Sequence, residues 1–210
     1  MKFKRIENYN NGENTYIVYD EVTKNAFVID PGCKISDILN SASEDEINIK
    51  YIFLTHCHYD HIEYMEDLRE KTSALLVCSK NCANNIKNPS VNLSGAGLGF
   101  NIIAKDEEIV LDDGEDFVID SMTVKCIYTP GHTDCSVCYL VENELFCGDT
   151  LFLRNCGRWD LPTGDENTLK KSVREKIYTL DDEITLHPGH GEKTTVGYEK
   201  NFNFFIKLAD

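Results

Sequence analysis

The chain has 210 residues, of which 41% are hydrophobic and 27% are charged, so it can bury a core, and we expect one domain over residues 1–210. The 36 acidic and 21 basic residues give a net charge of −15. This charge argues against nucleic-acid binding, which depends on Lys and Arg side chains that neutralise phosphates.

No apolar run approaches the roughly 20 residues that a membrane helix needs. Residues 1–7 carry charges but lead into polar residues rather than an apolar signal region. We therefore expect a cytoplasmic protein with no membrane partner. An odd number of cysteines, nine, without an export signal predicts reduced thiols rather than disulfides.

Short apolar runs separated by polar turns predict many strands along the chain. The expected strands are 15–19, 25–29, 51–54, 75–78, 108–111, 116–119, 122–128, 137–141, 145–147 and 183–186. The turn Asp112-Asp113-Gly114 is expected to join two of them. Helical spacing or composition predicts helices at 35–42, 62–71, 169–180 and 198–206. Segment 81–100, rich in Asn, Ser and Gly, is expected to be a long loop or weak helix that borders a substrate cleft.

The densest cluster of reactive side chains is Thr55-His56-Cys57-His58-Tyr59-Asp60-His61, which follows the apolar run 51–54. Three of the six histidines of the chain lie in it. Imidazole and carboxylate groups are common metal ligands, and loops held by a rigid scaffold are where reactive groups usually lie. We interpret the stretch as a metal-binding loop.

Three further segments place a ligand-type residue beside glycine, just past a predicted strand. They are Thr129-Pro130-Gly131-His132, Gly148-Asp149-Thr150 and Pro188-Gly189-His190-Gly191. Each segment alone is a weak signal, because a histidine after a turn is more often a surface residue. Together with the first cluster they put five of the six histidines at strand ends, which favours one shared site.

This combination resembles the ligand set of the metallo-β-lactamase fold hydrolases, from the Val28-Ile29-Asp30-Pro31-Gly32 entry to the Pro188-Gly189-His190-Gly191 exit. The resemblance implies an α/β fold, an αββα sandwich of two mixed β-sheets flanked by helices. It implies that His56, His58 and His132 hold one metal ion. Asp60, His61 and His190 would hold a second, and Asp149 would bridge both. Two divalent ions are implied, zinc first, with iron or manganese as alternatives.

Within that family the chain is similar to the short bacterial glyoxalase II-like (hydroxyacylglutathione hydrolase-like) branch. The similarity lies in Gly148-Asp149-Thr150-Leu151-Phe152, in Gly157-Arg158-Trp159-Asp160-Leu161-Pro162, and in the segment around His190. It implies hydrolysis of a small acyl thioester such as S-lactoylglutathione, in which Asp60 and Asp149 act with a metal-bound hydroxide. Arg158 either contacts an anionic substrate or pairs with Asp160.

The chain also departs from that branch. Ile62-Glu63-Tyr64 stand where small residues are usual, and Cys135 replaces a glycine. Full-length glyoxalase II has a helical C-terminal domain that grips glutathione, whereas this chain ends 20 residues after His190, so glutathione use stays open.

Two other functions remain as alternatives. Thr-His-Cys-His at 55–58 and Cys-Gly-Arg at 156–158 are also similar to persulfide dioxygenases, which hold a single iron at the first site. A non-catalytic metal-binding module would predict that some ligands are missing, and none is. We expect His187 to point away from the metals and Cys57 to be a packing residue.

Overall fold

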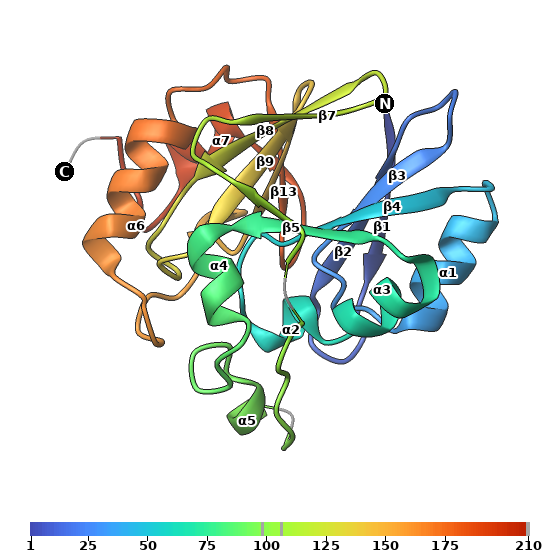
Figure 1. The fold of residues 1–210 in the computed structure, drawn as a ribbon. Coiled ribbons are helices and arrows are strands. Elements are labelled where there is room, and N and C mark those ends of the chain that lie inside the picture. The colour runs from blue at the N-terminus through green and yellow to red at the C-terminus, as the bar shows by residue number, and fades with distance from the viewer. Residues whose placement is uncertain (98, 106, 209–210) are drawn as a thin grey trace.

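The computed structural model describes residues 1–97, 99–105 and 107–208, and its strands form two large sheets (Figure 1). The first sheet runs in the order β1 (Lys2–Glu7), β2 (Asn14–Tyr19), β3 (Asn25–Ile29), β4 (Asn48–Phe53), β5 (Leu75–Ser79), β6 (Ile109–Leu111). β1, β2 and β3 pair antiparallel, and β3 to β6 pair parallel.

The second sheet runs in the order β14 (Thr194–Thr195), β13 (Thr185–Pro188), β10 (Glu144–Gly148), β9 (Val137–Val141), β8 (Met122–Tyr128), β7 (Asp116–Ile119). Only β10 and β13 pair parallel within it. A small hairpin, β11 (Leu151–Phe152) and β12 (Asn155–Cys156), follows β10.

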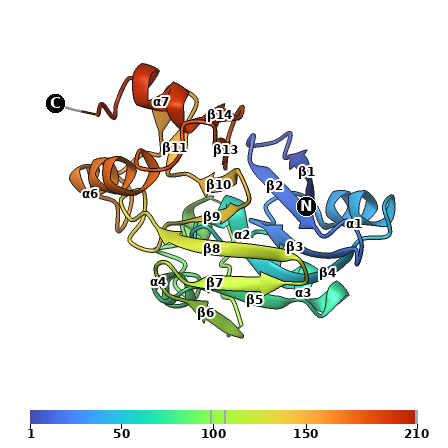
Figure 2. The same cartoon turned by 90° about the horizontal axis from the view of Figure 1, so that it is seen from above.

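Helices cover the outer faces of both sheets. The helices of the described residues are α1 (Ile35–Ser43), α2 (Tyr59–Ile62), α3 (Met65–Thr72), α4 (Lys80–Asn85), α5 (Ser94–Gly97), α6 (Glu166–Ser172) with its π-helical continuation (Val173–Ile177), and α7 (Val196–Phe202). From above, α1 and α3 lie beyond the first sheet and α6 lies beyond the second (Figure 2). The predicted αββα sandwich of two mixed sheets is confirmed. Among the described residues no helix is long and apolar enough to cross a bilayer.

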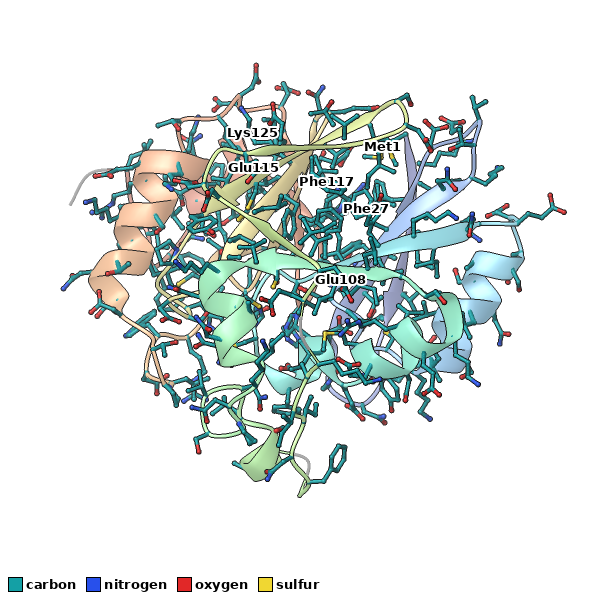
Figure 3. The ribbon with its side chains drawn as sticks, viewed as in Figure 1. Met1, Phe27, Glu108, Glu115, Phe117 and Lys125 are labelled. Atoms are coloured by element: carbon teal, nitrogen blue, oxygen red, sulfur yellow. The ribbon has the colours of Figure 1, made fainter. Side chains whose placement is uncertain are left out.

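Successive side chains on a strand point to opposite faces of its sheet, and the buried side chains form three apolar layers. On β2, Ile17 packs in the layer beneath α1 and α3, whereas Val18 packs between the two sheets. Aromatic rings from both sheets interlock there: Phe53 lies 5.7 Å from Phe117 and 5.0 Å from Tyr139 between ring centres. Figure 3 shows Phe27 and Phe117 in this middle layer. All nine cysteines are buried free thiols, as expected from the sequence.

Three predicted elements differ in detail. The helix expected at 62–71 is split into α2 and α3, because the Tyr64 amide donates to the Pro31 carbonyl (3.0 Å) and leaves the helical pattern. The turn at 112–114 does not close a hairpin, since β6 joins the first sheet and β7 the second.

The C-terminal helix stops at Phe202 rather than continuing to 206. There the Asn203 side chain accepts the amides of Phe205 and Ile206 (3.0 Å each) and ends the helix. The edge strand β1, rich in Lys and Arg, was missed because charged residues interrupt its apolar pattern. In the predicted loop 81–100, Leu98 lies outside the described residues.

Candidate metal centre

The candidate ligands converge where strands of both sheets end at one rim. The loop after β4 carries His56, His58, Asp60 and His61, with Asp60 and His61 already in the first turn of α2. From the second sheet, His132 follows β8, Asp149 follows β10 and His190 follows β13. These three strands run in the same direction, so their carboxyl ends meet at one edge.

The structure brings all seven predicted metal ligands together, as two groups of three with Asp149 between them. Ring nitrogens of His56, His58 and His132 lie within 4.8 Å of one another, and so do ligand atoms of Asp60, His61 and His190. Asp149 lies between the groups: its Oδ2 is 3.6 Å from His132 Nε2, and its Oδ1 is 3.4 Å from His61 Nε2. The same Oδ2 is 3.8 Å from His190 Nε2.

The donor atoms fit metal ions. Nε2 of His56, Nε2 of His61 and Oδ1 of Asp149 are buried, and none of them makes a hydrogen bond with the described residues. A buried polar atom without a partner is costly, so the arrangement is explained by cations that these atoms would face. A third group of neighbours, Asp30 with His56 and His61, fits less well because both Asp30 oxygens already accept hydrogen bonds.

The pKa shifts show that the site favours positive charge beside its carboxylates, which is held by a proton on His61 and would be supplied by a metal ion. Burial, reinforced by the neighbouring imidazoles, holds the pKa of His56 well below its usual range, so the ring is neutral as a metal ligand must be. Burial opposes charge on His61, but the carboxylates of Asp149 and Asp60 outweigh it and raise the pKa of His61. Burial likewise opposes charge on Asp149, yet His61 and His132 keep its pKa well below the usual value. The site thus contains anionic oxygens that a cation would neutralise.

Two residues that the sequence analysis did not assign to the site hold His61 and His56 in place. Asp30 Oδ2 accepts from His61 Nδ1 (3.0 Å) and from Thr55 Oγ1 (2.5 Å), and its Oδ1 accepts from the Thr55 amide (2.8 Å). Thr55 Oγ1 also lies 3.0 Å from His56 Nδ1. Both contacts leave Nε2 of the rings facing the site. The available signal was the position of Asp30 directly after the predicted strand 25–29, in the Val28–Gly32 motif.

Glu13 is a third residue that the sequence did not single out. It is fully buried beside Thr15, whose hydroxyl donates to it, and residue 13 bridges His190 through the backbone. Burial raises the pKa of its carboxyl well above the usual value. Nothing in its sequence surroundings, a polar turn, indicated a buried acid.

Position 189 requires glycine because neighbouring side chains lie too close to its Cα for a Cβ to fit. A Cβ there would lie 2.4 Å from Asp149 Oδ1 and 2.6 Å from His61 Cε1. Gly148 combines a positive φ of 48° with a Cβ position 2.2 Å from Thr55 Oγ1. The glycines that flank the predicted ligands therefore make room for the ligand side chains, in addition to permitting tight turns.

A cleft of about 470 Å³ opens over these groups, and its walls include Tyr59, Leu93, Phe152, Arg158 and Leu161. Arg158 has two separate contacts. Its carbonyl accepts from His132 Nδ1 (2.7 Å), which orients the ring, and its side chain forms a two-pronged pair with Asp160 (2.7 and 2.8 Å). Both members of that pair are largely exposed, at 62% and 64%. Such a pair costs little to break.

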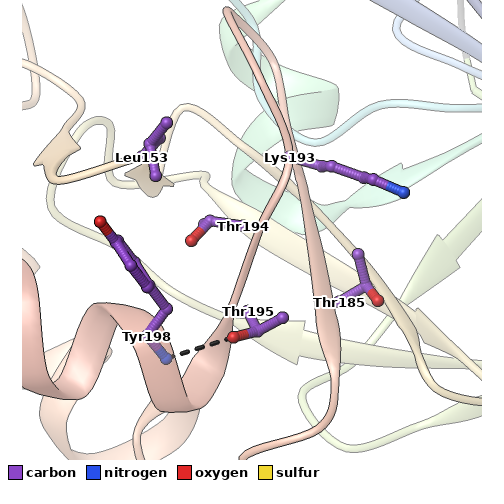
Figure 4. A pocket seen from close by; sticks show the side chains of 6 residues that line it. All are labelled: Leu153, Thr185, Lys193, Thr194, Thr195 and Tyr198. Atoms are coloured by element: carbon purple, nitrogen blue, oxygen red, sulfur yellow. Dashed lines mark hydrogen bonds between the residues drawn. The ribbon is translucent and has the colours of Figure 1, made fainter.

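The sixth histidine lies elsewhere, as expected. His187 Nε2 is 2.5 Å from Glu144 Oε2, and the ring stacks on Phe146. Cys57 is fully buried in the helix-side core layer, also as expected. A different hollow of about 390 Å³ lies over β13, β14 and α7 (Figure 4). It shares no lining residue with the cleft, and its Thr194 hydroxyl already donates to the buried Glu199 (2.7 Å).

Known proteins share this architecture. The sequence pattern of the metallo-beta-lactamase superfamily matches residues 9–190. A probable metallo-hydrolase of Streptococcus pyogenes is 32% identical over 98% of this chain and 90% of its own length. The hydroxyacylglutathione hydrolase GloC of Haemophilus influenzae is 30% identical, over 92% of each chain.

Solved structures of other proteins have the same fold. The B3 metallo-beta-lactamase BLEG-1 superposes with a TM-score of 0.92 at 31% identity over all of both chains. ETHE1 of Myxococcus xanthus gives 0.81 at 29% identity over 97% of this chain and 84% of that one. TTHA1623, in a di-iron-bound form, gives 0.83 at 26% identity over 97% of this chain and 100% of that one. The chain belongs to the metallo-beta-lactamase superfamily.

Proposed function

We propose that this protein is a metal-dependent hydrolase of small acyl thioesters, resembling hydroxyacylglutathione hydrolases. The observation that carries the proposal is the pair of ligand groups with Asp149 between them at the head of a cleft. The 30% identity to GloC over nearly the whole chain supports the thioester class. The reaction adds water across the C–S bond and yields a carboxylic acid and a thiol.

In this proposal His56, His58 and His132 hold one divalent ion, Asp60, His61 and His190 hold a second, and Asp149 contacts both. Imidazole and carboxylate ligands suit zinc, with iron or manganese as alternatives. Ions bound there would lower the pKa of water to about 7 and polarise a carbonyl oxygen. Asp30 and the Arg158 carbonyl keep two of the ligand rings oriented.

We assign the thiol part of the substrate to the part of the cleft next to Arg158. The exposed guanidinium can exchange Asp160 for a carboxylate of the thiol. A thiolate is a good leaving group, so the residues near Arg158 need not include a strong general acid.

Asp149→Ala tests the proposed bridging position. We expect thioester turnover to fall by at least about 100-fold and the metal content per chain to drop, because both groups lose one ligand. Metal analysis and a thioester panel are run on the same sample. Full turnover by the variant would refute the assignment of Asp149.

The alternative, an iron-dependent persulfide dioxygenase that uses the first group alone, is favoured by the likeness to ETHE1 only at the level of the fold. His190→Ala separates the two functions. For the hydrolase it should remove one ion and thioester turnover. For the dioxygenase it should leave a single iron and oxygen consumption on a persulfide unchanged, which would replace our proposal.

Arg158→Ala tests the substrate contact. We expect KM to rise about two- to fivefold for anionic thioesters and to stay constant for neutral ones, as for an exposed ion pair. Asp160→Asn is the matched control, because it frees the guanidinium and should lower KM for the same anionic substrates. Unchanged KM in both variants would show that the Arg158–Asp160 pair does not contact the substrate.

A further inference from the structure

The segment between α4 and β6, which contains α5, extends below α2 and α4, away from the two sheets (Figure 1). Leu93 of this segment lines the cleft over the ligand groups and also lines an adjoining hollow of about 410 Å³. The other residues of that hollow are small or uncharged: Pro89, Ser90, Gly95, Ala96 and Asn101. Leu93 therefore borders both the candidate reacting centre and the adjoining uncharged hollow.

The backbone of Leu93 adopts an unusual conformation, with φ of 65°, a left-handed value that is uncommon for a bulky residue. The preceding Asn92 fixes it. The buried Asn92 amide donates to the carbonyls of Ile86 (2.9 Å) and Ile102 (3.0 Å), and its Oδ1 accepts from the Ser94 amide (2.9 Å). These bonds hold the two ends of the segment together around Leu93.

Asn92 also ties the segment to the ligand loop. Its carbonyl accepts from the amide of Tyr59, which lies between His58 and Asp60 (2.8 Å). Leu93 is thus placed at a fixed position relative to the candidate ligands. A strained conformation that the surroundings maintain at a cleft is more often functional than accidental.

The hollows that adjoin the cleft differ in the charge of their lining residues. Arg158 and Asp160 line a second hollow next to the cleft, whereas the hollow beside Leu93 has no charged side chain among its described lining residues. An acyl thioester has the same polarity when its thiol carries charge and its acyl group does not.

We propose that Leu93 and its hollow bind an apolar, unbranched acyl chain, so that the substrates are medium-chain acyl thioesters. This inference rests on the proposed thioester hydrolysis and names its acyl group. Each methylene that leaves water for an apolar wall is worth about a fourfold gain in kcat/KM. Leu93 determines specificity in this scheme and takes no part in bond cleavage.

The test uses one neutral thiol, N-acetylcysteamine, esterified with saturated acyl groups from acetyl to octanoyl. With the metal-loaded wild-type enzyme we expect kcat/KM to rise about fourfold per methylene until the hollow is filled. Leu93→Ala should flatten this rise. Leu153→Ala, another partly exposed leucine but in the separate hollow of Figure 4, should keep it.

A second variant guards against loss of folding. Asn tolerates left-handed backbone better than Leu, so Leu93→Asn should match or exceed the wild-type melting temperature while it loses the chain-length dependence. The proposal is overturned if kcat/KM of the wild type does not increase with acyl chain length. It is also overturned if the increase is unchanged in both Leu93 variants.

Binding of the product acids, measured by calorimetry, separates this inference from the proposed function. Octanoate should bind more tightly than acetate, and Leu93→Ala should weaken octanoate alone. If octanoate binding depends on Leu93 but no thioester is cleaved, the acyl site stands and the reaction is wrong. If thioesters are cleaved without any preference for chain length, the reaction stands and the acyl site is wrong.

Discussion

At the scale of single residues, Asp30 shows how the fold prepares a ligand before any metal arrives. Its backbone is left-handed, with φ of 50°, and this turn directs the carboxylate back to Thr55 and His61. One carboxylate therefore fixes both the start of the ligand loop and the orientation of an imidazole within it. Partners of this kind are where metal affinity is tuned.

Asp30→Asn should weaken metal binding about 10- to 100-fold, because an amide cannot accept all three of the hydrogen bonds that Asp30 receives. Competition with a chromogenic chelator measures the affinity. Asp67→Asn, which changes an exposed carboxylate on α3, serves as the control and should leave metal affinity unchanged. Equal affinity in the Asp30 variant and the wild type would show that His61 is oriented by packing alone.

At the scale of elements, a turn-to-turn contact joins the two sheets at the end of β2. Asp20 accepts from the amides of Val22 (2.8 Å) and Thr23 (3.0 Å) in its own turn. It also accepts from the amide and hydroxyl of Ser121, in the turn between β7 and β8. The Ser121 hydroxyl and then these amides lower the pKa of Asp20 well below its usual value.

The sign of the resulting pH dependence follows from that shift. A carboxyl whose pKa is lowered on folding stabilises the protein above its unfolded pKa of about 3.9, and this contribution is lost as the pH falls through the lower folded value. Asp20→Asn should therefore lower the free energy of unfolding near about pH 7, and the difference from wild type should shrink toward about pH 3. Urea unfolding across this range measures it.

The exposed Asp67 of α3 provides the comparison for this experiment. Asp67→Asn shows what the loss of one negative charge does by itself to stability over the same pH range. A constant gap between the Asp20 variant and wild type at all pH values would mean that shape, and not charge, holds the two turns together.

At the scale of the whole molecule, each group of ligands draws on both sheets. His56 and His58 come from the first sheet and His132 from the second, and Asp60 and His61 are joined by His190 in the same way. An ion in either group would cross-link the sheets at one rim, beside the aromatic layer that packs them together. Metal binding would therefore be coupled to packing of the two sheets.

Removal of metal with a chelator should lower stability through this coupling. With free metal about 100-fold above its dissociation constant, each ion adds about 2.7 kcal/mol to the free energy of unfolding. Its loss should lower the melting temperature by roughly 5–10 °C for a chain of this size. Calorimetry with and without chelator measures the shift, and Asp149→Ala should show much less of it. Identical melting temperatures for wild type in both conditions would contradict the cross-link.

Much of the fold followed from local pattern. Alternating or continuous apolar runs such as 15–19 and 137–141 were predicted as strands because side chains on a strand alternate between two faces that are both buried here. Errors arose where a distant partner overrides the pattern. Pro31 ends the helical run at Tyr64, and pairing with β5 takes β6 into the first sheet. No local pattern contains those partners.

The sequence by itself determined which residues are candidates for the metal centre, because imidazoles and carboxylates just past strands are chemically distinctive wherever the strands lie. Only the tertiary structure decided how they are held and what stands around them. Asp30, Glu13, Asn92 and Leu93 gain their significance from contacts across the chain, such as the Asn92 carbonyl on the Tyr59 amide. Such contacts form only when the two sheets and the long loop pack together. Packing brings together residues that are far apart along the chain, and no local sequence pattern marks them as partners.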